Sequence, residues 1–145
     1  MVFKKILAML LCGLILCTSL TASAYAETTA PIVESEVAPA YEIASNAQSS
    51  LNFIGTTAYC TSNAGGIETV SITVEQTLQK QGFLWLWYKV DDASWTATVN
   101  KSNISVSNTK SGLSSGKYRL KSVFTFTNKS GKSETITVYS NEKSI

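Results

Sequence analysis

Side chains suited to catalysis are few and scattered in this chain. It contains no histidine, and Asp91 and Asp92 are its only adjacent carboxylates. Neighbours on a strand point to opposite faces, and neighbours in a turn point to solvent, so this pair is poorly placed to act as acid and base on one bond. No glycine-rich phosphate loop and no Gly-x-Ser-x-Gly motif occur. We therefore expect no enzyme, no catalytic residue, no metal site and no cofactor, with a calcium-binding hairpin tip at Asp91 and Asp92 as the alternative.

Cysteine chemistry is also limited. Cys12 and Cys17 lie in an apolar segment near the start of the chain, which leaves Cys60 alone in the remainder. A lone thiol could pair between chains or act as a nucleophile, but no histidine is present to generate a thiolate. We expect Cys60 to be a small buried apolar side chain.

The most unusual pattern is the run from Phe83 to Val90, which is apolar on both faces if it forms a strand. Aromatic side chains on alternate positions of a strand stand about 6.5 to 7 Å apart, a spacing that suits stacking on successive sugar rings. The candidate ligand-binding residues are therefore Phe83, Trp85, Trp87 and, from a neighbouring strand, Trp95. The alternative is that one tryptophan fills the core and the other lies under a loop or the N-terminal spacer.

The elements that would position these residues are short strands. From residue 51 onward, β-branched and aromatic residues alternate with polar ones and are broken by glycine and asparagine. In the run Thr69–Leu78 only Gln76 interrupts the inward apolar set, and Tyr118–Phe126 repeats the alternation before an Asn128–Gly131 turn and a return over 135–139. Further strands are expected at 51–59, 83–90, 94–99 and 104–106. This predicts an all-β, antiparallel, immunoglobulin-like sandwich of about seven strands.

Four residues are expected to be structural. Tyr118 and Leu120 have the spacing of a tyrosine corner, in which a tyrosine near the start of the sixth strand bonds to upstream backbone and the residue two later faces the core. Ile72 and Val74 would supply the second-strand core positions, and Trp85 and Trp87 follow them at about the distance of the core tryptophan in such domains. Aliphatic residues would then replace the usual disulfide.

The N-terminus predicts export. Lys4 and Lys5 precede the apolar run 6–17, and Ala24-Tyr25-Ala26 is a small-x-small cleavage site. The run is shorter than the ~20 residues that a membrane-spanning helix needs, so we expect no membrane anchor. A lipoprotein modified at Cys12 or Cys17 is the alternative. The expected organisation is a signal peptide over 1–26, a flexible acidic spacer over 27–50 and a sandwich domain over 51–145, secreted to the extracellular space.

Charge does not identify a partner. The chain carries 12 Lys+Arg and 10 Asp+Glu, and removal of Lys4 and Lys5 makes them equal. The region 101–132 is basic, which would suit an anionic polymer, but lysines interleaved on strands usually solvate one face and protect edges. We expect no nucleic acid partner.

The domain resembles small secreted single-domain proteins of unknown function from Gram-positive gut anaerobes. The residues that carry the resemblance are Trp95, the run from Gly116 to Lys121 (GKYRLK) and the run from Gly131 to Thr135 (GKSET). The resemblance implies a bacterial extracellular setting and no particular activity. The expected function is that of a non-enzymatic extracellular binding or interaction module, with a glycan or cell-wall polymer as candidate partner. A carbohydrate-binding module and a self-associating surface protein are the alternatives.

Overall fold

A computed structural model describes residues 41–145 of this chain. The predicted signal peptide, 1–26, and the spacer residues 27–40 lie outside the described residues. No helix among those described is long and apolar enough to cross a membrane.

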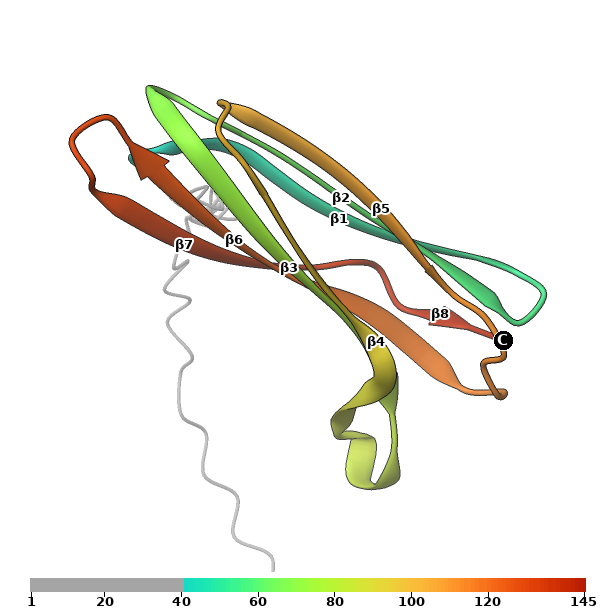
Figure 1. The fold of residues 1–145 in the computed structure, drawn as a ribbon. Helices are drawn as coiled ribbons and strands as arrows, with labels where there is room; N and C mark the ends of the chain where they lie inside the picture. The colour runs from blue at the N-terminus through green and yellow to red at the C-terminus, as the bar shows by residue number, and fades with distance from the viewer. Residues whose placement is uncertain (1–40) are drawn as a thin grey trace, which may run out of the picture. The chain divides into compact units, whose positions relative to one another are not determined.

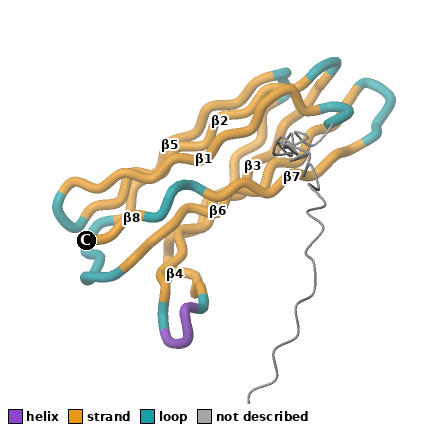
Figure 2. Tube along the Cα trace, turned by 180° about the vertical axis from the view of Figure 1, so that it is seen from behind, coloured by secondary structure: helices purple, strands orange, loops and turns teal. Residues whose placement is uncertain are grey.

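Two antiparallel sheets form the domain (Figures 1 and 2). One sheet has the strand order β1-β2-β5, and the other has the order β4-β3-β6-β7, with the short β8 paired to β6. The strands are β1 (Ala44–Ile54), β2 (Thr57–Gly66), β3 (Thr69–Gln81), β4 (Trp87–Val99), β5 (Asn103–Lys110), β6 (Lys117–Asn128), β7 (Ser133–Tyr139) and β8 (Lys143–Ser144). This confirms the predicted antiparallel β-sandwich.

Two strand boundaries near the start differ from the sequence prediction. The chain reverses at Gly55, whose φ of 57° is left-handed, so the expected strand 51–59 is a hairpin of β1 and β2. Strand β1 begins at Ala44, inside the range that the sequence assigns to the spacer. The early part of β1 reads as polar because it lies at a sheet edge and buries only small side chains such as Ala44 and Ala47 against the core.

Alternation along β3 and β6 places the core as predicted. Ile72, Val74, Leu120 and Phe124 are fully buried. Val70, also expected to face inward, is instead exposed near the start of β3. The buried side chains form two clusters, one around Phe124 and Phe126 and the other around Leu78, Tyr118 and Leu120.

A layer of polar side chains separates the two clusters. Gln76, Ser62 and Ser122 are fully buried, and Ser49 and Asn108 join them from β1 and β5. The Gln76 amide donates to Ser62 Oγ at 2.6 Å and accepts from Asn108 Nδ2 at 2.7 Å, while Ser122 Oγ lies 2.7 Å from Ser62 Oγ and 2.9 Å from Ser49 Oγ. We call these five residues the polar belt. Each of its members comes from a different strand, so it links both sheets at one level.

Tyr118 forms the predicted tyrosine corner. Its ring is buried, and its hydroxyl donates to the Ser114 carbonyl at 2.6 Å. The second strand in chain order is β2, and not 69–78 as predicted. Its Cys60 packs in the same cluster as Leu120. Ile72 and Val74 therefore belong to the third strand.

Glu134 of β7 fixes the start of β1. Its carboxylate accepts hydrogen bonds from the backbone N–H groups of Ala44 at 3.0 Å, Ile43 at 2.9 Å and Glu42 at 3.3 Å. These bonds, first those from Ala44 and Ile43, hold the pKa of Glu134 below its ordinary value. Lys132 adds a favourable charge and forms an ion pair with Glu42.

The polar belt generates a first prediction. In Gln76→Leu, Asn108 and Ser62 lose their buried partner, and we expect the free energy of unfolding to fall by about 1–3 kcal/mol. Urea denaturation followed by circular dichroism measures it. The matched control is Gln48→Leu on the exposed side of β1, which should change stability by no more than about 0.5 kcal/mol. Equal stability of Gln76→Leu and wild type would contradict the role given to the belt.

Glu134 generates a second prediction, in pH dependence. Because its pKa is lower in the folded than in the unfolded chain, the carboxylate stabilises the fold above the unfolded pKa of about 4.3 and this stabilisation disappears as the pH falls through the lowered folded value. Glu134→Gln should therefore be less stable than wild type at neutral pH, and the two should converge in acid. Urea denaturation across a pH series checks this; a difference independent of pH would contradict it.

Candidate functional site

The hairpin between β3 and β4 ends in an apolar loop, Gly82–Leu86, which we call the tip loop. Gln81 pairs with Trp87 as the last rung of the two strands, and the 3₁₀ turn η1 (Phe83–Trp85) closes the hairpin. The Gly82 N–H donates to the Leu86 carbonyl at 2.8 Å across the loop. The prediction of a strand over 83–90 is therefore wrong for residues 83–86, and no continuous aromatic strand face exists there.

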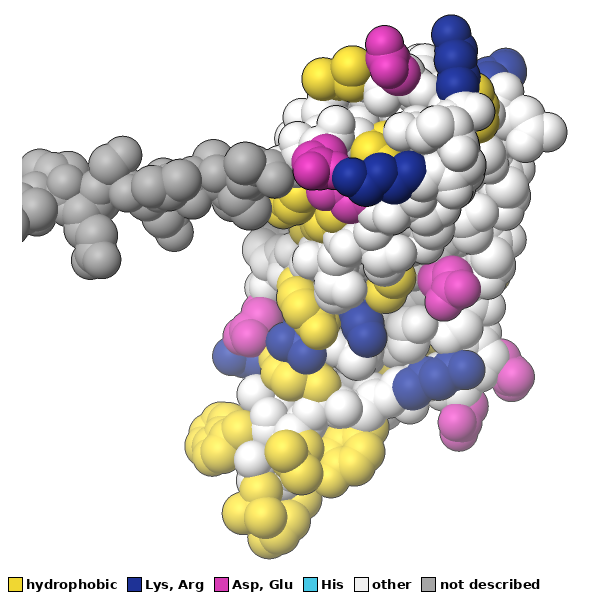
Figure 3. Space-filling model, turned by 90° about the vertical axis from the view of Figure 1, so that its left-hand side faces the viewer, with side chains coloured by type: hydrophobic (Ala, Val, Ile, Leu, Met, Phe, Trp, Pro, Cys, Tyr) yellow, Lys and Arg dark blue, Asp and Glu magenta, His cyan; other side chains and the backbone are white. Residues whose placement is uncertain are grey.

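The apolar side chains of the tip loop are exposed, as is Tyr88 at the start of β4. Phe83 is 80% exposed, Trp85 79%, Leu84 66%, Leu86 54% and Tyr88 51%. Figure 3 shows the apolar side chains gathered at one end of the domain, projecting beyond the sheets. Contiguous exposed sets of large apolar side chains are typical of interaction surfaces in proteins.

The backbone of the tip loop is strained as well as exposed. Leu84 (φ 55°) and Trp85 (φ 63°) both adopt the left-handed conformation, although neither is glycine. Left-handed conformation costs an L-residue roughly 1–2 kcal/mol. Because these two side chains are mostly exposed, few contacts within the domain offset that cost. Strain of this kind at a solvent-exposed position points to a functional role.

Tyr88 helps to hold the base of the tip loop. A Cβ atom on Gly82 would lie 2.8 Å from its ring, so the ring covers the Gly82 backbone. Only glycine permits this close approach.

Trp87 is occupied by contacts within the domain. The guanidinium of Arg119 lies 4.3 Å from the centre of the Trp87 ring and 4.1 Å from that of Tyr139, and its Nε donates to Gln79 Oε1 at 2.8 Å. Arg119 is thus held between two aromatic rings on one face of the sheet. This ring face of Trp87 is not free to stack on a sugar.

Trp95 lies apart from the tip loop. It is half-buried, pairs with Gln76 across the β3–β4 ladder and packs against the cluster around Leu120. The four aromatic residues predicted to form one binding face therefore separate into an exposed pair, Phe83 and Trp85, and two that pack on the domain. The alternative, in which one tryptophan fills the core and the other lies under a loop or the spacer, is wrong as regards the core, because neither Trp85 nor Trp87 is buried.

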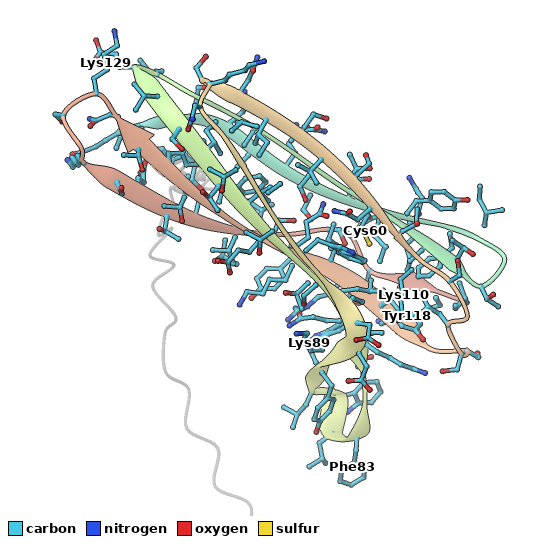
Figure 4. All side chains as sticks on the ribbon, viewed as in Figure 1. Cys60, Phe83, Lys89, Lys110, Tyr118 and Lys129 are labelled. Atoms are coloured by element: carbon cyan, nitrogen blue, oxygen red, sulfur yellow. The ribbon has the colours of Figure 1, made fainter. Side chains whose placement is uncertain are left out.

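An open pocket of about 400 Å³ lies beside the base of the tip loop. Three lysines line it, Lys80 from β3, Lys89 from β4 and Lys110 from β5, together with Tyr88 and Asp91. Lys80 Nζ donates to Ser114 Oγ at 2.7 Å and lies 5.4 Å from the centre of the Tyr118 ring. Figure 4 shows Lys89 and Lys110 set back from Phe83 at the end of the hairpin. The pocket is suited to an anion next to an apolar surface.

Asp91 and Asp92 lie in an irregularity of β4 and not at a hairpin tip. The β3–β4 register passes from Thr77–Ser94 to Gln79–Lys89, so residues 90–93 bulge opposite Leu78, and Asp92 has a φ of 51°. Among residues 41–145, no three carboxylate, histidine or cysteine side chains gather to hold a metal ion. Cys60 is buried, and desolvation raises the pKa of its thiol to about 12, so it stays a neutral thiol.

No protein-family model matches the chain, and no curated protein matches it. Among solved structures it is similar to OgpA of Akkermansia muciniphila in two crystal forms, with 14% identity over 71% of this chain and 32% of OgpA at a TM-score of 0.40, and 14% over 72% and 31% at 0.39. The chain thus spans about a third of the length of OgpA.

The sequence contained one signal for the loop. Gly82 directly precedes the run that lacks alternation, and a strand of a two-layer sandwich should not be apolar on both faces. Left-handed Leu84 and Trp85 carried no signal, because these residue types rarely adopt that conformation.

The tip loop generates a third prediction, on stability. Asparagine tolerates the left-handed conformation and removes the apolar side chain. We expect Leu84→Asn with Trp85→Asn to leave the free energy of unfolding unchanged or raise it by up to about 1 kcal/mol. The same change in an ordinary strand conformation, Val70→Asn, should lower it by up to about 1 kcal/mol. Thermal unfolding followed by circular dichroism compares them; a loss in the loop variant larger than that in Val70→Asn would show that the tip side chains serve the fold.

Proposed function

We propose that this chain is a non-catalytic binding module that works outside a bacterial cell and contacts its partner through the tip loop. The single observation that carries the proposal is a strained and exposed run of large apolar side chains at the end of the β3–β4 hairpin. Neither exposed apolar side chains nor left-handed backbone at non-glycine residues stabilises a fold. A partner that covers Phe83, Leu84 and Trp85 supplies the missing contacts.

The extracellular setting rests on residues 1–26, which have the pattern of a signal peptide. The chain has no histidine, and the lysine pocket, within the described residues 41–145, is lined by a single carboxylate, Asp91; both observations support a role without catalysis. The resemblance to small secreted proteins of Gram-positive gut anaerobes suggests that the partner belongs to a bacterial surface or its surroundings.

The carbohydrate-binding alternative has a weaker basis than the sequence suggested. It would depend on Phe83 and Trp85 alone, since Trp87 is stacked on Arg119 and Trp95 packs against the core. Residues 82–86 also carry no hydroxyl, amide or charged side chain, and the Trp85 indole N–H is their only side-chain hydrogen-bonding group. Sugar recognition needs more polar partners than this.

A binding experiment tests the proposal. The chain from Glu27 onward would be incubated with envelopes of a Gram-positive gut anaerobe, and the bound fraction measured after sedimentation. We expect Leu84→Asn with Trp85→Asn to reduce binding at least about tenfold, because burial of two large apolar side chains is worth well over 1.4 kcal/mol. Val70→Asn, away from the tip, is the control and should bind as wild type does. Equal binding by the loop variant would refute the role of the loop.

A further inference from the structure

The tip loop is convex and apolar, and the lysines that line the pocket at its base, Lys80, Lys89 and Lys110, are cationic. Figures 1 and 4 show the β3–β4 hairpin extending beyond the rest of the sandwich, with Phe83 at its end. A projecting tip cannot itself enclose a ligand, so it must enter either a cavity of its partner or a deformable surface. Its side chains are those of the membrane interface, where Trp and Tyr anchor at the headgroups while Leu and Phe reach the acyl chains.

The charges behind the tip complement an anionic surface. Lys80, Lys89 and Lys110 line the pocket at its base, against the single carboxylate of Asp91. Within residues 41–145 the ion pairs are Lys117–Glu142 and Lys132–Glu42, so none of the three pocket lysines is neutralised by a direct carboxylate contact there. Lysines close to an anionic leaflet each contribute about fivefold in affinity, which corresponds to ~1 kcal/mol.

Taking the proposed binding role of the tip loop as its basis, we propose that the tip loop inserts into the interface of an anionic phospholipid bilayer. Phe83, Leu84 and Trp85 enter the boundary between headgroups and acyl chains, and Lys89 and Lys110 contact lipid phosphates. A bilayer accepts a convex apolar tip without a complementary pocket and needs no hydrogen bonds from residues 82–86. The contact is peripheral and reversible, with no membrane-spanning segment required.

Vesicle binding tests this inference. The chain from Glu27 onward, free of the apolar run 6–17, would be mixed with vesicles of phosphatidylcholine alone or of equal parts phosphatidylcholine and phosphatidylglycerol. Co-sedimentation gives the bound fraction, and quenching of tryptophan fluorescence by brominated acyl chains reports insertion. We expect binding to the anionic vesicles that weakens with salt, quenching that is lost in Trp85→Asn, and at least about a tenfold loss of affinity in Leu84→Asn with Trp85→Asn.

Matched charge variants test whether the pocket lysines contact the anionic surface. Lys89→Gln with Lys110→Gln should lose about 20-fold in affinity for anionic vesicles, whereas Lys101→Gln with Lys129→Gln should lose much less. Lys101 follows β4 and Lys129 lies in the β6–β7 turn, at the end of the sandwich opposite the tip loop (Figure 4). Equal losses in the two double variants would overturn the assignment, because the attraction would then come from net charge alone.

Three further outcomes would overturn the inference. One is no binding of wild type to either vesicle, another is equal binding by the tip-loop variant, and the third is concentration-dependent self-association that only the tip-loop variant loses. If vesicles fail to bind but envelope binding still depends on the tip loop, the partner is not lipid and the proposed function stands. If envelope binding is also independent of the loop, both fail.

Discussion

The polar belt is the constraint on which the rest of the sandwich depends. Five hydrogen-bonding side chains from five strands meet at one level between two apolar clusters, and no buried side-chain nitrogen or oxygen in the described residues lacks a partner. A strand shifted by one residue would turn its core side chains to solvent, and a shift by two would bury a hydroxyl or amide among aliphatic side chains. The belt therefore fixes strand register without the disulfide common in immunoglobulin domains.

A stably paired sandwich can tolerate a loop whose backbone conformation and exposed side chains are unfavourable. The tyrosine corner at Tyr118 and the Glu134 bonds to the start of β1 hold other parts of the sandwich. The β3–β4 hairpin can then carry left-handed Leu84 and Trp85, because the ladder below them, from Gln81–Trp87 downward, is formed. The lysine pocket lies near this hairpin, where β3 and β5 end and β4 begins. The proposed contact with a partner is thus made by a loop whose large side chains are mostly exposed.

Sequence patterns predicted the elements whose period is regular and failed where the backbone departs from it. Strands β3, β6 and β7 and the Asn128–Gly131 turn follow from alternation and turn chemistry. The residue types of the run 83–90 favour a strand, yet its first half forms a loop. Sequence patterns do not predict the bulge at residues 90–93 either, since it depends on how β4 pairs with β3 around Leu78. Pairing between strands decided both.

The sequence by itself determined the class of the fold, the buried set that includes Ile72, Val74 and Leu120, and the scarcity of groups for catalysis. These follow from local alternation, turn residues and composition, which act over a few positions. Only the tertiary structure decided that Trp87 is held by Arg119 and that Trp95 packs on the core, leaving Phe83 and Trp85 exposed. Exposure of an aromatic side chain depends on neighbours distant in the chain, and strand pairing sets those neighbours.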